Sequence, residues 1–344
     1  MKKILVTGNQ GYIGSVLCDR LSKNYLIDGY DSGYFCNDLI DKKFKDNVNY
    51  QYNQDIRKMN YKILKNYDCV IHLSALSNDP IGEFNEDLTY KINFEASVEL
   101  FKKSIENKVK NFIFISTQSI YGFSDTNIKI DESNENINPI TAYAKSKWLV
   151  EQEIFKSTDK IFVCSLRPST IFGYSPRFRR DIVLNNLVSN SFLNNNLEIH
   201  SDGSPWRPVL HINDLCDCIN ACILNMSKIN GNSFNLGLEN GNYQVKDIAA
   251  KVSKAFNNLK PIFTNNHKDP RSYKVSFNKY ANFLGQYFLP FRSIEFGIYE
   301  LIDQFNRLEY DKNTTVNCFR LDYLKNRIKN NSLNNNLEII HEIQ

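Results

Sequence analysis

The 344-residue sequence has no apolar run that approaches the roughly 18 residues needed to cross a bilayer. The first apolar segment, which follows Met1-Lys2-Lys3, is about four residues long and too short for the core of a signal peptide. Long runs of one charge are missing too, and the 42 basic residues are nearly balanced by 38 acidic ones. These absences argue against a membrane protein and against nucleic acid as the default partner, and we expect a globular, cytoplasmic protein.

The eight cysteines include no C-x-x-C pair and have no accompanying histidine cluster, so neither disulfides nor a zinc site is indicated. Cys216, Cys218 and Cys222 lie in one otherwise apolar segment with helical periodicity. We interpret them as buried thiols rather than as metal ligands.

A glycine-rich turn stands near the start of the chain. Gly8, Gly11 and Gly14 follow the apolar strand Ile4-Leu5-Val6 and run into a segment, residues 13–21, whose apolar positions repeat at helical spacing. A strand, a glycine turn and a helix together point backbone N–H groups and the positive end of the helix dipole at one spot, which suits a diphosphate. The spacing is G-x-x-G-x-x-G rather than the commoner G-x-G-x-x-G, so a glycine turn without a ligand is the alternative.

An acidic residue is expected about 20 residues after such a turn, at the end of the second strand, where it accepts hydrogen bonds from a ribose. Asp31 occupies that position. Because a carboxylate there repels a 2′-phosphate, the sequence favours NAD over NADP.

Strand and helix patterns alternate along the first half of the chain, which predicts an α/β fold with a Rossmann-type doubly wound parallel sheet and a smaller, discontinuous C-terminal substrate domain. We assign residues 1–174 to the NAD-binding domain, to which residues 207–238 return. Residues 175–206 and 239–310 form the substrate domain. Residues 311–344 form a tail with one short packed helix followed by fraying.

Ligands of such sheets bind at the carboxyl ends of the strands, which here place Gly8, Asp31, Ser74 and Thr117 along one edge. Tyr143 and Lys147 are four residues apart on a predicted helix, so their side chains share one face. A tyrosine is a poor base at neutral pH unless a nearby ammonium favours the phenolate, and Lys147 supplies that field. The Thr117 hydroxyl can hold a reacting oxygen while Tyr143 takes its proton. The alternative is an aromatic anchor beside a surface lysine.

Several pieces of the sequence resemble, in order, motifs of the extended short-chain dehydrogenase/reductase family, in its nucleotide-sugar epimerase and dehydratase branch. They are Thr7-Gly8-x-x-Gly11-x-x-Gly14, Asp55-Ile56, His72-Leu73-Ser74-Ala75, Asn93, Ser116-Thr117-x-x-Ile120-Tyr121-Gly122, Tyr143-x-x-x-Lys147 and Arg167-Pro168. The resemblance implies NAD as the cofactor, Tyr143 as the acid/base and Lys147 as a ligand of the nicotinamide ribose. The cofactor-binding residues that it implies are Gly8, Gln10, Gly11, Tyr12, Ile13, Gly14, Asp31, Asp55, Ile56, Leu73, Ser74, Ala75, Asn93, Ser116, Tyr143, Lys147 and Pro168.

The resemblance also implies substrate-binding residues, among them several arginines. The segment from Trp206 to His211 resembles the family segment whose arginine binds a nucleotide diphosphate, and Arg271-Ser272-Tyr273 resembles a second arginine site. Forked guanidinium donors suit a pyrophosphate, and solvated loop charge is the alternative for each arginine. The implied substrate-binding residues are Thr117, Gln118, Ser119, Tyr143, Arg177, Arg179, Arg207 and Arg271.

The residues after Thr117 distinguish the reactions of the family. Its 4,6-dehydratases carry an Asp-Glu pair where this chain has Gln118 and Ser119, and epimerase-reductases of the GDP-fucose synthase kind carry a cysteine at the position of Ser119. The sequence therefore predicts an NAD-dependent nucleotide-sugar 4-epimerase, which oxidises and re-reduces C4 through a keto intermediate.

Two alternatives stay open. One is a net nucleotide-sugar 4-dehydrogenase or reductase, for example on a GDP-heptose, because residues 171–181 resemble GDP-heptose-modifying enzymes as well as UDP-glucose epimerases. The other is a non-catalytic NAD-binding regulator, against which the intact Thr117, Tyr143 and Lys147 argue. The family often dimerises through helices that correspond here to residues 88–107 and 143–155, so a homodimer is expected.

Overall fold

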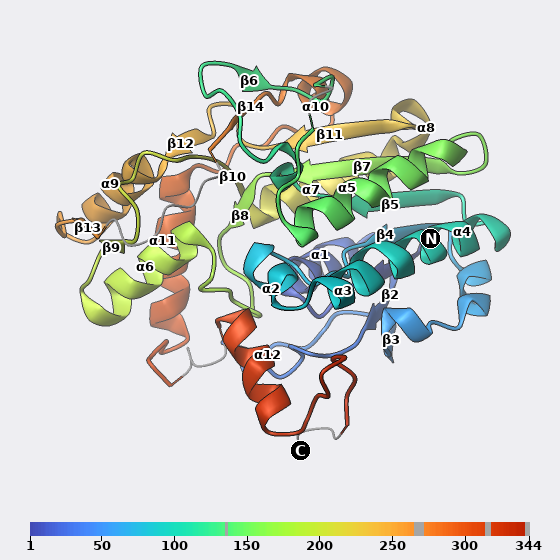
Figure 1. Cartoon of the computed structure of the whole chain (residues 1–344), viewed down its shortest axis with the longest axis horizontal. Helices are drawn as coiled ribbons and strands as arrows, with labels where there is room; N and C mark the ends of the chain where they lie inside the picture. Colours follow the sequence, from blue (N-terminus) through green and yellow to red (C-terminus); the bar gives the residue numbers. More distant parts are fainter. Residues whose placement is uncertain (135–136, 265–271, 314–317, 341–344) are drawn as a thin grey trace.

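The computed structural model describes residues 1–134, 137–264, 272–313 and 318–340. Within these residues the centre of the molecule is a seven-stranded, wholly parallel sheet with the strand order β3-β2-β1-β4-β5-β7-β11 (Figure 1). Its strands are β1 (Lys3–Thr7), β2 (Leu26–Asp31), β3 (Tyr50–Asn53), β4 (Cys69–His72), β5 (Asn111–Ile115), β7 (Phe162–Pro168) and β11 (Asn232–Leu236). The order reverses between β1 and β4, as in a Rossmann fold, so the predicted fold class is confirmed.

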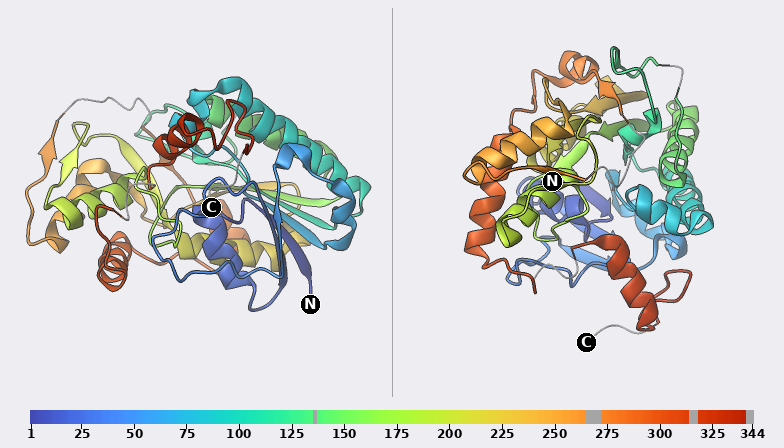
Figure 2. Two further views of the ribbon diagram at one scale, coloured as in Figure 1. Left: turned by 90° about the horizontal axis from the view of Figure 1, so that it is seen from below. Right: turned by 60° about the vertical axis from the view of Figure 1, so that its left-hand side comes forward.

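The sheet is buried on both faces, which explains why its strands read as nearly continuous apolar runs. Because side chains alternate along a strand, Ile4 and Val6 pack into one core cluster while Leu5 packs into another. Helices cover each face (Figures 1 and 2). One face carries α1 (Tyr12–Leu21) and α7 (Ile212–Leu224), and the other carries α2 (Asp79–Phe84), α3 (Glu86–Thr89), the π-helical η3 (Tyr90–Glu95), α4 (Ala96–Glu106) and α5 (Ala142–Ile154).

A second lobe lies beside the sheet, with its own core around Phe178, Leu187, Ile248 and Phe305. The chain enters it after β7, leaves it for α7 and β11, and enters it again afterwards (Figure 1). The elements of this lobe are α6 (Val183–Asn194), β9 (Glu198–Ile199), α9 (Val245–Ala255), β13 (Ile262–Phe263) and α11 (Ile294–Arg307). The domain boundaries given above remain our proposal.

Smaller elements complete the fold. A three-stranded sheet has the order β12-β10-β8, and a two-stranded sheet pairs β14 with β6. The bounds are β6 (Lys129–Ile130), β8 (Thr170–Phe172), β10 (Trp206–His211), β12 (Asn242–Gln244), β14 (Lys274–Val275), α8 (Met226–Ile229), α10 (Asn278–Leu284), η1 (Ile56–Lys58), η2 (Tyr61–Asn66), η4 (Gln118–Tyr121) and η5 (Phe155–Ser157).

The C-terminal tail contains helix α12 (Arg320–Lys329), whose Leu324 is fully buried. The fraying expected after this helix does not occur in residues 330–340. Leu333 and Leu337 are buried in the same core cluster as α4 and α5, and Leu333 forms a bridge with Ile339. In the sequence these two leucines stand among asparagines, so they do not form a recognisable apolar pattern.

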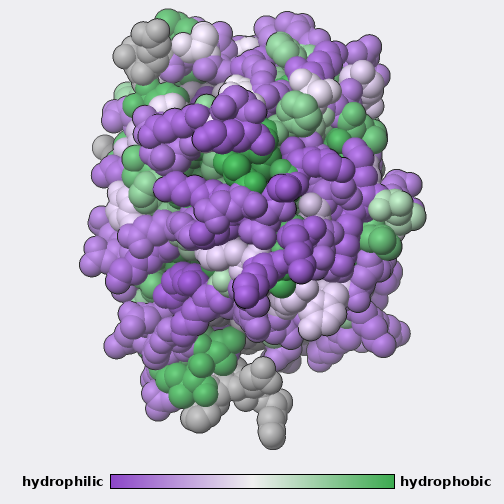
Figure 3. All heavy atoms as spheres, turned by 90° about the vertical axis from the view of Figure 1, so that its right-hand side faces the viewer, coloured by the Kyte–Doolittle hydropathy of each residue, from purple (hydrophilic) through white to green (hydrophobic). Residues whose placement is uncertain are grey.

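The described residues contain no helix that is both long and apolar enough to cross a membrane. The face in Figure 3 is mostly hydrophilic, with small, separate apolar areas.

Candidate active site

A cleft of about 460 Å³ lies at the carboxyl edge of the sheet, where the strand order reverses. The ends of β1, β2, β4, β5 and β7 contribute to its wall, as do Arg179 from the second lobe and Arg207 from β10. Parallel strands bring residues that are far apart in the sequence to this one edge.

The glycine turn lies at one side of the cleft, and its geometry requires glycine. Gly8 has a φ of +75°, and a Cβ there would lie 2.7 Å from the backbone nitrogen of Ser74. A Cβ on Gly14 would lie 2.3 Å from the carbonyl oxygen of Gly8, so α1 packs close to the turn. Gly11 is the N-cap of α1 and no side chain caps the helix. The first N–H groups of α1 therefore suit the diphosphate of a dinucleotide.

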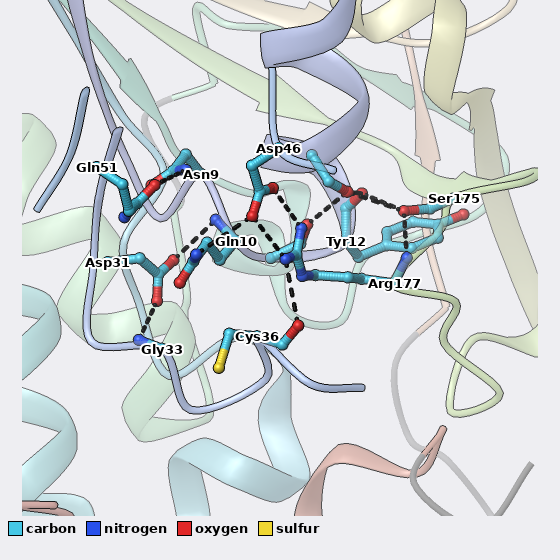
Figure 4. Close-up of polar contacts among 12 residues, drawn as sticks. Asn9, Gln10, Tyr12, Asp31, Gly33, Cys36, Asp46, Gln51, Ser175 and Arg177 are labelled. Carbon is cyan, nitrogen blue, oxygen red and sulfur yellow. Dashed lines mark hydrogen bonds and ion pairs between the residues drawn. The ribbon is translucent and has the colours of Figure 1, made fainter. Parts of the chain in front are cut away.

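Asp31 ends β2 at the edge of the same cleft. One of its carboxylate oxygens accepts the backbone N–H of Gln10 at 3.1 Å, and the other accepts that of Gly33 at 2.9 Å (Figure 4). These bonds fix the carboxylate, and each oxygen has capacity for a further donor. Burial raises the pKa of Asp31, while the two backbone hydrogen bonds lower it. The arrangement fits a ribose whose hydroxyls donate to Asp31.

Tyr143 lies in the first turn of α5, which Thr141 caps by accepting the N–H of Ala144 at 3.2 Å. The short helix α2 packs directly against it, since a Cβ on Gly82 would lie 2.8 Å from the Cβ of Tyr143. Lys147, one turn later, donates from Nζ to the carbonyl oxygen of Ile115 at 2.8 Å. The tyrosine and the lysine therefore face the cleft together, as the spacing predicted.

Burial dominates the electrostatics of this pair. It raises the pKa of Tyr143 to about 12, helped by the carboxylate of Asp79 and opposed by a hydrogen bond with Thr117 and by the charge of Arg179. It lowers the pKa of Lys147 to about 7, against the attraction of Glu151. Burial thus favours the neutral form of both groups, and a further positive charge in the cleft would favour the phenolate of Tyr143 but oppose the ammonium of Lys147.

Thr117 and its two successors point in different directions. Thr117 accepts the N–H of Ser119 at 3.1 Å and caps η4, and both side chains line the cleft. Gln118 does not line it. Its amide donates to the carbonyl oxygens of Arg167 and Leu236 at 3.0 and 3.2 Å, deep in the protein. The structure thus replaces the predicted substrate-binding role of Gln118 with a structural one.

Two of the predicted substrate arginines reach the cleft. Arg179 donates to both carboxylate oxygens of Asp181, at 2.8 and 2.9 Å, and to the hydroxyl of Ser77 at 3.1 Å. Arg207 donates to the carbonyl oxygen of Trp206 at 2.8 Å. Arg271 lies outside the described residues.

Arg177 does not reach the cleft, contrary to its predicted role in substrate binding. Its guanidinium donates to both carboxylate oxygens of Asp46, at 2.6 and 2.8 Å, and to the carbonyl oxygen of Cys36 at 3.3 Å (Figure 4). Only 2% of the Arg177 side chain is exposed. A guanidinium that is buried and neutralised in this way fastens the loop after β2 to the second lobe and presents no charge to a substrate.

Two predicted cofactor ligands are also absent from the wall of the cleft. The Asn93 side chain pairs with the backbone of Leu76, accepting its N–H at 2.8 Å and donating to its carbonyl oxygen at 3.1 Å. The Gln10 side chain donates to Asp46 at 3.2 Å. Both side chains shape the loops around the cleft rather than line it.

The other predicted residues come together in one place. The cleft is lined by Gly8, Gly11, Tyr12, Ile13, Gly14, Asp31, Asp55, Ile56, Leu73, Ser74, Ala75, Ser116, Thr117, Ser119, Tyr143, Lys147, Pro168, Arg179 and Arg207.

Sequence reasoning missed several further lining residues, among them Tyr34, Phe35, Ser77, Asp79, Tyr273 and Arg320. Ser77 and Asp79 come shortly after the recognised segment from His72 to Ala75, in and just beyond the loop that connects β4 to α2, so their closeness to a strand end was a usable signal. Arg320, from the tail, carried no such signal.

Comparison with known proteins agrees with this geometry. Residues 4–237 match the model of the NAD dependent epimerase/dehydratase family, so the chain belongs to that family, and its cofactor is NAD. An "uncharacterized UDP-glucose epimerase" of Bacillus subtilis, YtcB, is 28% identical over 68% of this chain and 76% of its own. A dTDP-D-glucose 4,6-dehydratase of Dictyostelium discoideum is 26% identical over 73% of this chain and 62% of its own.

Solved structures of nucleotide-sugar epimerases have a similar fold. A UDP-glucose 4-epimerase of Thermotoga maritima with UDP-glucose superposes with a TM-score of 0.74 at 25% identity, over 89% of this chain and 99% of its own. A variant UDP-glucuronic acid 4-epimerase of Bacillus cereus, in complex with a UDP-sugar and NAD, superposes with a TM-score of 0.76 at 25% identity and with the same coverage.

Proposed function

We propose that this protein is an NAD-dependent nucleotide-sugar 4-epimerase. The observation that carries the proposal is the convergence of Tyr143, Lys147 and Thr117 at the carboxyl edge of the sheet, next to Ser119 rather than an acid pair. Elimination of water from a sugar needs an acid and a base besides the tyrosine. The sequence places neutral residues at the two positions where the dehydratases of this family carry those groups, and Gln118 faces away from the cleft.

Each residue has a role that follows from its surroundings. Thr117 positions the C4 hydroxyl of the sugar by a hydrogen bond, and Tyr143 removes its proton. NAD, when bound, would supply the acceptor and donor of hydride at C4. Lys147 would hold the ribose next to the nicotinamide, and the positive charge of a bound nicotinamide would lower the pKa of Tyr143 from its raised value, as the charge of Arg179 already does. A 4-keto sugar that turns over in the cleft then takes hydride on its other face, and Tyr143 returns the proton.

The substrate class follows from the cations of the cleft. Arg207 and Arg179 are the donors that we assign to the diphosphate of the nucleotide sugar, because both line the cleft and forked guanidinium donors suit a diphosphate. The third arginine of the wall, Arg320, belongs to the tail and lies beside Phe35. The Thermotoga enzyme was solved with UDP-glucose, which makes UDP-hexoses the first substrates to test.

The test follows the hydrogen at C4 by NMR in UDP-, GDP-, CDP- and dTDP-hexoses deuterated at that carbon. An epimerase keeps the label at C4 in both epimers. A label that accumulates in the reduced cofactor would show a net 4-dehydrogenase, and a label that moves to C6 would show a dehydratase, and either result overturns the proposal. Homodimerisation and a cytoplasmic location remain predictions, the first open to light scattering.

A further inference from the structure

The C-terminal segment, residues 318–340, lies across the loop that follows β2. Arg327 donates to the carbonyl oxygen of Tyr34 at 2.8 Å, and the hydroxyl of Tyr34 donates to the carbonyl oxygen of Leu337 at 2.5 Å. Tyr34 is thus held from both sides by residues about 300 positions later in the chain. The segment lies beyond residue 237, where the match to the family model ends.

Arg320 connects this segment to the cleft. Its guanidinium forms an ion pair with Asp38, and the two side chains are 2% and 4% exposed. It also donates to the carbonyl oxygen of Arg177 at 3.0 Å and lies 4.1 Å from the ring centroid of Phe35. Arg320 and Phe35 both line the cleft. One tail residue therefore joins the loop after β2, the second lobe and the wall of the cleft.

The tail also reaches the opposite rim. Helix α12 lies beside α2 in Figures 1 and 2, and Lys325 lies 5.7 Å from the ring centroid of Phe84 at the end of α2. Because α2 follows β4 and the loop with Tyr34 follows β2, α12 spans the two strand ends between which the glycine turn of β1 lies.

The part of the cofactor beneath this span follows from the neighbouring residues. Tyr34 and Phe35 line the cleft together with Asp31, Asp55 and Ile56. Asp31 is the ribose ligand of the proposed site, and the other two follow β3 at the same end of the cleft. Aromatic faces and a guanidinium plane at this position suit an adenosine.

We propose that residues 318–340 complete the adenosine site and retain the cofactor, with Arg320 as the positioning residue that fixes Phe35 and the loop after β2 over the bound NAD. Release of NAD then requires the buried Arg320–Asp38 ion pair to open, which makes release slow. Retention suits an enzyme that returns hydride to the sugar from which it came. The inference rests on the cofactor of the proposed function and extends it to the control of cofactor exchange.

The test measures the rate at which NADH leaves the full-length protein when excess NAD is added, from the loss of bound NADH fluorescence. Arg320→Ala is expected to speed release at least tenfold. Arg292→Ala is the matched control, because it breaks an ion pair with the fully buried Asp214 but touches neither the cleft nor the tail. Equal release from Arg320→Ala and the unmodified protein, or equal acceleration by Arg292→Ala, would overturn the inference.

A second variant covers the possibility that Arg320→Ala does not fold. Tyr34→Phe keeps the ring in the wall of the cleft and removes the hydrogen bonds of its hydroxyl with Leu337 and Ser32, so release should accelerate severalfold while the melting temperature falls by only a few degrees. Hydrogen exchange adds a readout that general stability does not move. Bound NAD should slow exchange in α12 more than in α9 of the second lobe, and equal slowing in both helices would contradict the inference. Failure of the unmodified protein to bind NADH would instead overturn the proposed function.

Discussion

Asp46 holds the guanidinium of Arg177 through both of its carboxylate oxygens, at 2.6 and 2.8 Å. The pair joins the loop after β2 to the second lobe, and Gln10 of the glycine turn donates to the same carboxylate. A charge expected to bind substrate thus stabilises the architecture of the cofactor site instead (Figure 4).

Replacement of Arg177 by alanine should therefore act on stability. It leaves the Asp46 carboxylate with the hydrogen bond from Gln10 but without its cation, which for a buried pair costs about 3–5 kcal/mol of unfolding free energy. KM for the nucleotide sugar should change less than about threefold, within the range of an indirect effect. Urea unfolding and steady-state kinetics check the two parts. A normal unfolding midpoint together with a large rise in KM would restore Arg177 to the substrate site.

Replacement of Arg207 by alanine should instead impair catalysis and leave stability nearly unchanged. It lines the cleft, and we assign it to the substrate diphosphate, so Arg207→Ala should lower kcat/KM by about 30- to 1000-fold, equivalent to about 2–4 kcal/mol. Its urea midpoint should stay close to that of the unmodified protein. Titration with NADH provides the control, because an equal loss of NADH affinity would place Arg207 at the cofactor.

Most residues of the proposed cofactor site could be predicted from the sequence, because the glycine turn, the alternating strands and the Tyr143–Lys147 spacing are all local patterns. It did not reveal which way a polar side chain turns at a strand end. Gln118 and Ser119 are neighbours, yet only Ser119 faces the cleft. Arg177 and Arg179 are two residues apart, but Asp46 buries the first while Asp181 holds the second at the cleft. Such choices depend on partners from distant segments, as does the position of Arg320 beside Asp38.

Asp31 should determine the choice between NAD and NADP. Asp31→Asn keeps an acceptor for only one of the backbone N–H groups of Gln10 and Gly33, and it removes the charge that repels a 2′-phosphate. The unmodified protein should bind NADH at least tenfold more tightly than NADPH, and the variant should narrow this ratio severalfold. Fluorescence titration with both cofactors measures it. A preference for NADPH in the unmodified protein would contradict the role of Asp31.

Lys147 should make the protein without cofactor more stable as the pH rises. Its pKa of about 7 in the folded protein lies below its ordinary value of 10.5, so between these values the unfolded chain binds more protons. The stability of the unmodified protein relative to Lys147→Met should therefore increase from pH 7 to pH 10, on the order of 2–4 kcal/mol. Other titrating groups are common to both proteins and cancel in the difference. Parallel pH curves would show that Lys147 is not desolvated as the structure indicates.

Tyr143→Phe tests the chemistry most directly, since it keeps the aromatic ring in the first turn of α5 and removes only the titrating hydroxyl. The variant should fold and bind NADH normally but lose kcat by at least about 10²-fold, the typical contribution of a general acid–base. Ser119→Ala is the matched control, because it also removes a hydroxyl from the wall of the cleft and should cost less than tenfold.

The pH profile separates a base from a merely positioning phenol. Burial raises the pKa of Tyr143 to about 12, and the charge of Arg179 opposes this shift, so kcat/KM should rise with pH until Tyr143 is ionised. The residual activity of Tyr143→Phe should show no such rise. If the variant retained the same profile, another group would have to be the base, and the Thr117–Tyr143–Lys147 assignment would fail even though the fold and the NAD site stand.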